Sequence, residues 1–357
     1  MRLDEPAWWY GPEGERVARL LTPVAWAWGL VAEQRWKQAR AYVSQRPVIC
    51  IGNFTAGGTG KTPMALHMAS VVEGLLRSPV FLTRGYGGRL AGPHRIVTGD
   101  KPRDVGDEPL LLAARAPVVL ARDREQGARA IEAGGRPGDV IIMDDGLQNP
   151  SLAKDLSIAV VDGRRGIGNG YVMPAGPLRA PLQAQLARVD AIVINTPVGG
   201  DAVAGRDGTM VTDWVRRKFD GPILTSTTAP AGDTTWLEEG PIVAFAAIGA
   251  PERFFNLLRA SGARLAATRS FPDHHFFAEA DAAALLALAG QHKARLLTTE
   301  KDWVRLDEAG IHAGELRARS QTLKIALSFA DADQNRLVDL VASALAEQGR
   351  ARISKSP

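Results

Sequence analysis

Short runs of consecutive apolar residues alternate along the chain with segments in which apolar residues recur every three or four positions. Continuous apolar runs are typical of strands buried on both faces, and the intervening period is that of helices. The expected strands span 47–51, 80–83, 117–121, 140–143, 157–161 and 191–195, with helices at 62–76 and 123–133. The pattern predicts an α/β fold with a doubly wound, mostly parallel sheet.

A second, smaller α/β unit is predicted toward the end of the chain. Its expected strands span 242–247, 264–269, 295–298 and 322–327, and its helices span 251–260, 278–290 and 331–347. The stretch 199–240 is rich in Gly, Thr, Asp and Pro and is interpreted as a connector with little core of its own. We therefore expect an N-terminal helical region at 1–45, the main α/β domain at 46–220, a linker at 221–240 and the smaller α/β domain at 241–357, and a length of 357 residues suits two domains.

The N-terminal region concentrates aromatic residues. Five of the eight tryptophans lie there, at Trp8, Trp9, Trp26, Trp28 and Trp36. The apolar stretch 20–32 is shorter than the roughly 20 residues that a membrane span requires, and Pro23 and Gly29 interrupt it. Two hypotheses remain open from composition: an amphipathic helix lying in a lipid headgroup layer beside its own arginines, or a helix packed on the protein's core.

Bulk composition narrows the class of protein. The chain is 45% apolar and 23% charged, which is typical of a globular protein. Its net charge of +4 is not gathered into basic clusters, so nucleic acid is not an expected partner. The single cysteine, Cys50, excludes an internal disulfide and is interpreted as a small buried apolar residue. The N-terminal sequence lacks the pattern of a signal peptide, and we expect a cytoplasmic location.

A glycine-rich loop follows the first apolar run. Residues 52–63 have the sequence GNFTAGGTGKTP, which is typical of a phosphate-binding loop between a strand and a helix. The predicted nucleotide-binding residues are Thr55, Ala56, Gly57, Gly58, Thr59, Gly60, Lys61 and Thr62. Thr55 stands where the usual pattern has its first glycine. A glycine-rich turn that happens to carry a lysine is the structural alternative, and the strand before the loop argues against it.

Two adjacent carboxylates end another predicted strand. The apolar run 140–143 leads directly to Asp144 and Asp145, the usual position of an acid that holds Mg²⁺ in nucleotide-binding proteins. Together with the Thr62 hydroxyl they form the predicted metal site, and the sequence does not tell which aspartate contacts the ion. Lys61 and this pair together favour phosphoryl transfer.

Phosphoryl transfer to an alcohol requires a group that orients or deprotonates the acceptor hydroxyl. Asp107 lies in a tight turn ahead of an apolar helix, where it is a candidate base and equally a helix N-cap. Asp273, His274 and His275 follow one another between a predicted strand and helix of the smaller unit. No further Cys or His stands at ligand spacing, so the sequence argues against zinc. An imidazole held by a carboxylate would suit proton transfer if the two units face each other.

These motifs, taken in order, make the chain resemble the tetraacyldisaccharide 4′-kinase family. The similar segments are 8–11, 52–63, 84–88, 106–109, 144–148, 174–179, 244–255, 271–275 and 298–302. The resemblance implies ATP and Mg²⁺ as cofactors and a P-loop domain joined through a β linker to a smaller α/β domain. It also implies a glycolipid acceptor, tetraacyldisaccharide 1-phosphate, at the cytoplasmic face of the inner membrane. It favours residues 13–42 as a peripheral, monotopic membrane contact, because burial of acyl chains keeps such an acceptor in the bilayer.

The resemblance also implies roles for individual residues. Lys61 and Asp107 would be catalytic, with His274 as the partner of Asp107. Tyr86, Asn149 and Arg179 would contact the acceptor, and the forked donors of Arg179 suit the acceptor's own phosphate. Asn149 stands where the family usually has His, and an Asn side chain keeps a hydrogen-bond donor but cannot become cationic.

The expected activity is therefore transfer of the γ-phosphoryl group of ATP to the 4′-hydroxyl of the acceptor, with no obligate protein partner evident. The alternative of a different class is a P-loop switch or maturation NTPase acting on a protein partner. Its GTP-specific form is disfavoured because Glu300, Lys301 and Asp302 do not have the spacing of a guanine-recognition motif. An inactive lipid-binding module that retains the fold is the third alternative.

Overall fold

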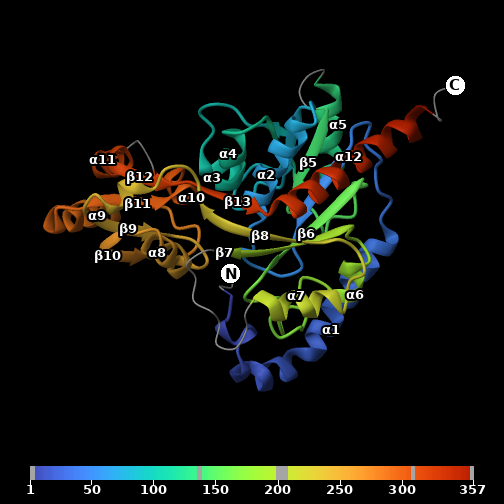
Figure 1. The fold of residues 1–357 in the computed structure, drawn as a ribbon, viewed down its shortest axis with the longest axis horizontal. Helices are drawn as coiled ribbons and strands as arrows, with labels where there is room; N and C mark the ends of the chain where they lie inside the picture. Colours follow the sequence, from blue (N-terminus) through green and yellow to red (C-terminus); the bar gives the residue numbers. More distant parts are fainter. Residues whose placement is uncertain (1–4, 135–138, 198–207, 307–309, 354–357) are drawn as a thin grey trace.

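The computed structural model describes residues 5–134, 139–197, 208–306 and 310–353, which form two sheets of unequal size. The larger sheet has nine strands in the order β13-β8-β7-β6-β1-β5-β2-β4-β3, and the smaller has four in the order β10-β9-β11-β12 (Figure 1). Every pairing is parallel except β3 with β4 and β8 with β13. The predicted α/β class, with a main unit and a smaller one, is confirmed.

The strands of the larger sheet are β1 (Val48–Gly52), β2 (Pro79–Thr83), β3 (His94–Arg95), β4 (Val118–Leu120), β5 (Val140–Asp144), β6 (Leu156–Asp162), β7 (Ala191–Pro197), β8 (Ile223–Pro230) and β13 (Ile325–Phe329). Its helices are α2 (Lys61–Gly74), α3 (Pro102–Val105), α4 (Asp107–Ala113), α5 (Arg124–Ala133), α6 (Leu182–Leu186), α7 (Gly208–Arg216) and α12 (Asp331–Ile353). The strand order places β1 between β5 and β6. Strands β2 to β4 lie on the β5 side of β1 and strands β6 to β8 lie on its other side, so the direction of the crossovers reverses at β1. Ligands of such sheets bind at that point, beyond the carboxyl ends of the strands.

Helices cover both faces of the larger sheet. Side chains of α2, α4 and α12 pack on one face, where Ile49, Phe81 and Ile142 are fully buried. Side chains of α5, α6 and α7 pack on the other face, around Cys50 and Ile141. The central strands are buried on both faces, which explains their continuous apolar sequence. Cys50 is a buried apolar residue as expected, and burial raises the pKa of its thiol to about 11.

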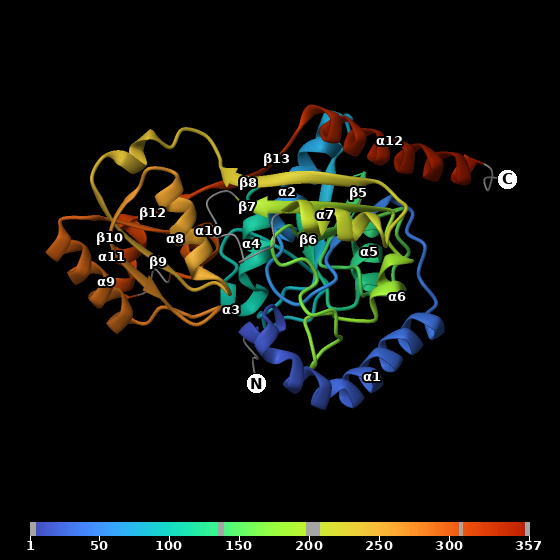
Figure 2. The same ribbon diagram turned by 60° about the horizontal axis from the view of Figure 1, so that its bottom comes forward.

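The smaller unit contains strands β9 (Pro241–Ala246), β10 (Arg264–Ser270), β11 (Arg295–Thr299) and β12 (Ser320–Leu323). Its helices are α8 (Pro251–Ala260), α9 (Glu279–His292), α10 (Glu300–Trp303) and α11 (Ile311–Arg319), and the 3-10 helix η3 (Thr235–Glu238) precedes β9. Helices α9 and α11 cover one face of its sheet and α8 covers the other. Figure 2 shows this unit beside α3 and α4 of the larger one.

Two boundaries differ from the prediction. The single strand expected at 322–327 is two strands, since β12 ends at Leu323 in the smaller sheet and β13 starts at Ile325 in the larger one. The last helix, α12, packs Leu337 and Val341 into the core of the larger unit. The connector is also more ordered than expected, because β8 joins the larger sheet and Val211 and Val215 of α7 are buried. Positions 198–207 of that connector lie outside the described residues.

The N-terminal region begins with two 3-10 helices, η1 (Ala7–Trp9) and η2 (Pro12–Gly14), and continues as α1 (Glu15–Gln38). Figures 1 and 2 show α1 along the outside of the larger unit, on the side away from α12. Pro23 lies within the helix without ending it. Within the described ranges, no helix is both long enough and apolar enough to cross a bilayer.

Candidate active site

The predicted phosphate-binding loop connects β1 to α2, between Asn53 and Gly60. Gly57 and Gly60 have φ values of 90° and 97°, a left-handed conformation that L side chains rarely adopt. A Cβ at Gly60 would also lie 2.6 Å from the Asn195 amide nitrogen. Two glycines of the motif are therefore required by backbone geometry, as expected for a loop that turns N–H groups inward around an anion.

Asn195 supports this loop from the end of β7. Its amide nitrogen donates to the carbonyl of Thr59 at 3.3 Å, and its oxygen accepts from Ser226 and Thr228 at 3.2 and 2.9 Å. From the sequence, Asn195 is predicted only to lie in a strand. A polar residue at the carboxyl end of a buried parallel strand was the available signal.

Lys61 is the first residue of α2 and lies over the loop. Its Nζ is 3.4 Å from the carbonyl of Gly57 and 3.9 Å from Asp145 Oδ1. Arg179 contacts the same carboxylate with Nη1, at 2.9 and 3.1 Å, and its Nε donates to the carbonyl of Thr55 at 3.0 Å. Burial would raise the pKa of Asp145, but Arg179 and Lys61 outweigh it and hold that pKa below its ordinary value. The structure thus brings Arg179, expected to contact the acceptor, to the phosphate-binding loop.

Asp144, the last residue of β5, has the features of a cation ligand. It is 1% exposed, and its Oδ1 has no hydrogen-bond partner among the described residues. Burial raises its pKa, and the charges of Glu108 and Asp145 add to that effect. The described residues contain no group of three or more His, Cys, Asp or Glu side chains that would hold a metal alone. One unpartnered buried carboxylate fits Mg²⁺, because this ion usually takes its remaining ligands from phosphates and water.

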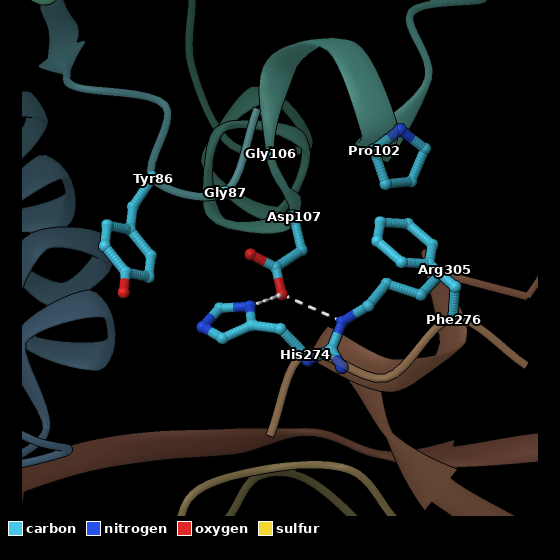
Figure 3. A pocket seen from close by; sticks show the side chains of 8 residues that line it. All are labelled: Tyr86, Gly87, Pro102, Gly106, Asp107, His274, Phe276 and Arg305. Carbon is cyan, nitrogen blue, oxygen red and sulfur yellow. Dashed lines mark hydrogen bonds and ion pairs between the residues drawn. The ribbon is translucent and has the colours of Figure 1, made fainter. Parts of the chain in front are cut away.

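Asp107 opens α4 at the base of a small pocket (Figure 3). The pocket is lined by Tyr86, Gly87, Pro102, Gly106, Asp107, His274, Phe276 and Arg305. The glycine-rich turn after β2 passes so close to the start of α4 that a Cβ at Gly106 would lie 2.6 Å from the carbonyl of Tyr86. Glycine at this position lets the two loops form one wall.

His274 of the smaller unit meets Asp107 of the larger one. His274 Nδ1 lies 3.1 Å from Asp107 Oδ2, and the two side chains are 11% and 3% exposed. The other oxygen, Oδ1, accepts the backbone N–H of Glu108 at 3.0 Å. Gly106 is the N-cap of α4, so the alternative of Asp107 as the cap is wrong. His274 adopts a left-handed φ of 59°, which is uncommon outside glycine and often marks a functional position.

The Asp107 carboxyl is held in its ionised form. Burial would raise its pKa, but the hydrogen bond from His274 and the charges of Lys301 and Arg305 outweigh burial and lower it. Arg305 Nε lies 2.8 Å from Asp107 Oδ2, and Lys301 Nζ lies 3.4 Å from Glu108 Oε1. Sequence reasoning missed both cations as site residues. The available signal was their position after an apolar strand of the smaller unit, and the comparison with a guanine-recognition motif had included Lys301 but not Arg305.

The remaining predicted residues differ in how they relate to this pocket. The ring of Tyr86 is 5.5 Å from that of His274, and its side chain is exposed. His275 faces elsewhere, because it bonds Asp281 at 2.9 Å and stacks on Phe271. Asn149 accepts from the backbone and hydroxyl of Ser151 within its own turn. The structure therefore joins Tyr86 to the Asp107–His274 pair and gives Asn149 a local role in shaping its loop.

Comparison with known proteins agrees with this arrangement. A family model described as tetraacyldisaccharide-1-P 4′-kinase matches residues 17–345. The tetraacyldisaccharide 4′-kinases of Methylorubrum extorquens and Rhodopseudomonas palustris are 45% and 46% identical to the chain, over 92% of its length and 95% and 93% of theirs. The structure of LpxK from Aquifex aeolicus in complex with ATP shares the fold, with a TM-score of 0.68 at 20% identity, covering 92% of this chain and 99% of that one. The chain therefore belongs to the tetraacyldisaccharide 4′-kinase family.

Proposed function

We propose that the chain transfers the γ-phosphoryl group of ATP to the 4′-hydroxyl of a tetraacyldisaccharide 1-phosphate, with Asp107 as the group that receives the acceptor. The observation that carries this assignment is the buried Asp107–His274 contact beside the phosphate-binding loop. Glu108, the neighbour of Asp107, acts electrostatically on Asp144 at the end of β5. The acceptor pocket and the phosphate site are therefore close enough to serve one reaction.

The phosphate half of the site works mainly through charge. Loop residues 55–60 supply main-chain N–H groups, and Lys61 lies where it reaches the β and γ phosphates. Thr62 and Asp144 would hold Mg²⁺, which supplies further positive charge to the transferring group when bound. Asp145 orients Lys61 and Arg179 by pairing with both. Phosphoryl transfer passes through a loose transition state, so positioning and charge stabilisation provide most of the catalysis.

Asp107 acts on the acceptor hydroxyl. Its lowered pKa makes it a weak base, and we assign it first to orienting the hydroxyl and then to accepting the proton as the new P–O bond forms. His274 fixes the carboxylate by donating from Nδ1. Tyr86 lies at the exposed side of the pocket and would contact the sugar. Arg179 and Asn149 are the further proposed acceptor contacts, and the bond from Arg179 to Thr55 suits the part of the acceptor nearest the phosphate-binding loop.

We assign α1 to contact with the surface of the inner membrane, on the cytoplasmic side, where the acceptor would lie. Small residues of the helix face the protein, since Ala18, Ala25 and Gly29 are buried. Large apolar residues are exposed, namely Val17, Leu20, Val24, Trp26, Trp28, Leu30 and Val31, although Trp28 also donates from Nε1 to the carbonyl of Arg179 at 3.3 Å. This arrangement is the reverse of a helix packed on its own core, so it favours the membrane hypothesis over the core alternative.

The test uses γ-labelled ATP and the disaccharide lipid in mixed micelles. The kinase assignment expects label in the lipid for the wild type and none for Lys61→Ala, because the loop loses its phosphate-neutralising charge. Lys218→Ala is the matched control, since Lys218 is exposed and far along the chain from the loop. Release of free phosphate with no labelled lipid would instead support a switch NTPase, and neither product would support an inactive lipid-binding module.

A further inference from the structure

Arg305 has no role in the proposed reaction so far, although it is one of the most buried charged residues. It is 4% exposed and follows α10 in the smaller unit. Its Nε lies 2.8 Å from Asp107 Oδ2, and its Nη1 lies 2.9 Å from the carbonyl of Ala247 and 3.2 Å from Asp302 Oδ1. It therefore links the candidate base of one unit to the sheet of the other.

We propose that Arg305 is a positioning residue that holds the Asp107 carboxylate ionised and turned so that Oδ1 faces the acceptor hydroxyl. The inference rests on the kinase function proposed above and adds a residue and an atom to it. Its basis is the geometry of four charged groups around Asp107, which come from both units.

The two carboxylate oxygens have different surroundings. Oδ2 accepts a hydrogen bond from His274 Nδ1 at 3.1 Å and forms an ion pair with Arg305 Nε at 2.8 Å, whereas Oδ1 accepts the N–H of Glu108 at 3.0 Å. Two nitrogens of the smaller unit lie within 3.1 Å of Oδ2, so a further donor has more room at Oδ1, and a carboxylate oxygen accepts about two hydrogen bonds. Figure 3 shows Oδ1 pointing to the side of the pocket on which Tyr86 lies. The acceptor hydroxyl is therefore assigned to Oδ1.

Arg305 is anchored independently of Asp107. Its contacts with Ala247 and Asp302 fix it to the smaller sheet, and Asp302 is itself fixed by the Ala247 N–H at 3.1 Å and the Thr299 hydroxyl at 2.7 Å. A planar guanidinium reaches Asp107 and these anchors at once, which a single ammonium does not. The smaller unit therefore holds the Arg305 guanidinium in a fixed position against Asp107.

Arg305 differs in its role from the other charged groups that face Asp107. His274 lies in the loop after β10, Lys301 in α10 and Glu108 in α4 beside Asp107. Lys301 pairs with Glu108 at 3.4 Å, so the charge of Lys301 is shared with that carboxylate. Arg305 instead places a planar guanidinium in direct contact with Asp107 Oδ2.

The experiment compares Arg305→Gln and Arg305→Lys with the wild type and with Arg317→Gln. Arg317 is a matched control because it is partly buried in the same unit, where it packs on Trp303 and bonds Leu306. The measurements are kcat for lipid phosphorylation, KM for ATP, the acid limb of the pH profile of kcat/KM for the lipid, and thermal unfolding by circular dichroism. Labelled lipid from the wild type establishes the activity first, so its absence would refute the proposed function and not this inference.

Arg305→Gln is expected to lower kcat by about tenfold or more and leave the KM for ATP unchanged. Its acid limb should move up by about 1 unit or more, because the base loses an adjacent cation. Arg305→Lys keeps the charge, so its limb should stay near the wild-type position while kcat falls. A folded Arg305→Gln enzyme with an unmoved acid limb, or one that matches Arg317→Gln in all measurements, would overturn the inference. If Arg305→Gln does not fold, Arg305→Lys decides: wild-type kcat refutes the positioning role, and reduced kcat with an unmoved limb supports it.

Discussion

The Asp107–His274 contact makes a quantitative prediction about coupling. The two side chains form a buried hydrogen bond of 3.1 Å to an ionised carboxylate, which is worth about 1.5 to 3 kcal/mol. At about 1.4 kcal/mol per factor of ten, removing His274 alone should lower kcat roughly 10- to 150-fold. Because the two residues act as one unit, the double variant should be no slower than the Asp107 variant alone.

The substitutions follow from the backbone. Asp107→Asn keeps the shape of the side chain, and His274→Asn suits the left-handed φ of 59° better than alanine does. Initial rates of label transfer from ATP to the lipid measure the two single variants and the double variant. His275→Asn is the control, since His275 bonds Asp281 and not Asp107. Rate losses that multiply in the double variant would show that the residues act independently and would refute the pairing.

Three further predictions concern other parts of the molecule. Asp107→Asn should lower the free energy of unfolding at pH 7 by about 3 kcal/mol, because it removes one partner of a buried ion pair. The native pKa of Asp107 is lowered, so the stability deficit of the variant should persist at every pH above the unfolded pKa of about 3.9. Denaturant titrations should show the deficit fading as the pH drops further toward the native pKa. A Cβ at Gly57 would collide with the Glu5 carboxylate, so this carboxylate lies against the phosphate-binding loop. Glu5→Gln should therefore lower the KM for ATP roughly two- to fivefold, from about 0.5 to 1 kcal/mol of like-charge repulsion. An unchanged KM in the lipid kinase assay would contradict this. Trp26 and Val24 are 68% and 58% exposed on α1. Replacing both with Ser should therefore weaken sedimentation of the protein with anionic vesicles while leaving its melting temperature unchanged. Equal sedimentation of the variant and the wild type would contradict the membrane contact.

Local chemistry explains why much of the fold was predictable. Strands β1, β5, β6 and β7 are buried on both faces, so their apolar sequence is continuous and their positions were correct within one or two residues. The phosphate-binding loop was recognisable because its glycines are required by positive φ and by the close approach of Asn195. Requirements of this kind act within a short stretch of chain and leave a short motif.

Long-range pairing explains what was missed. Strand β13 follows β12 after a single residue, yet it pairs with β8, which lies far earlier in the chain. An apolar run predicts that a strand forms but does not indicate which sheet the strand joins. Arg305 was missed for a related reason, because its partner Asp107 lies in the other unit and no spacing along the chain links them. The Asp107–His274 pairing was expected only through resemblance to the family.

The smaller unit contacts both halves of the site, and this explains why the site needs two units. Arg253 of α8 pairs with Asp162 at 2.7 Å and approaches the carbonyl of Gly58 in the phosphate-binding loop at 3.4 Å. On the same unit, His274 reaches Asp107. The phosphate-binding loop and Asp107 both belong to the larger unit, and the smaller unit supplies side chains that contact each of them, so its docking supports the alignment that in-line phosphoryl transfer requires. A rotation of the smaller unit would therefore withdraw His274 from Asp107 and Arg253 from the loop together, and we expect it to lower the rate of phosphoryl transfer.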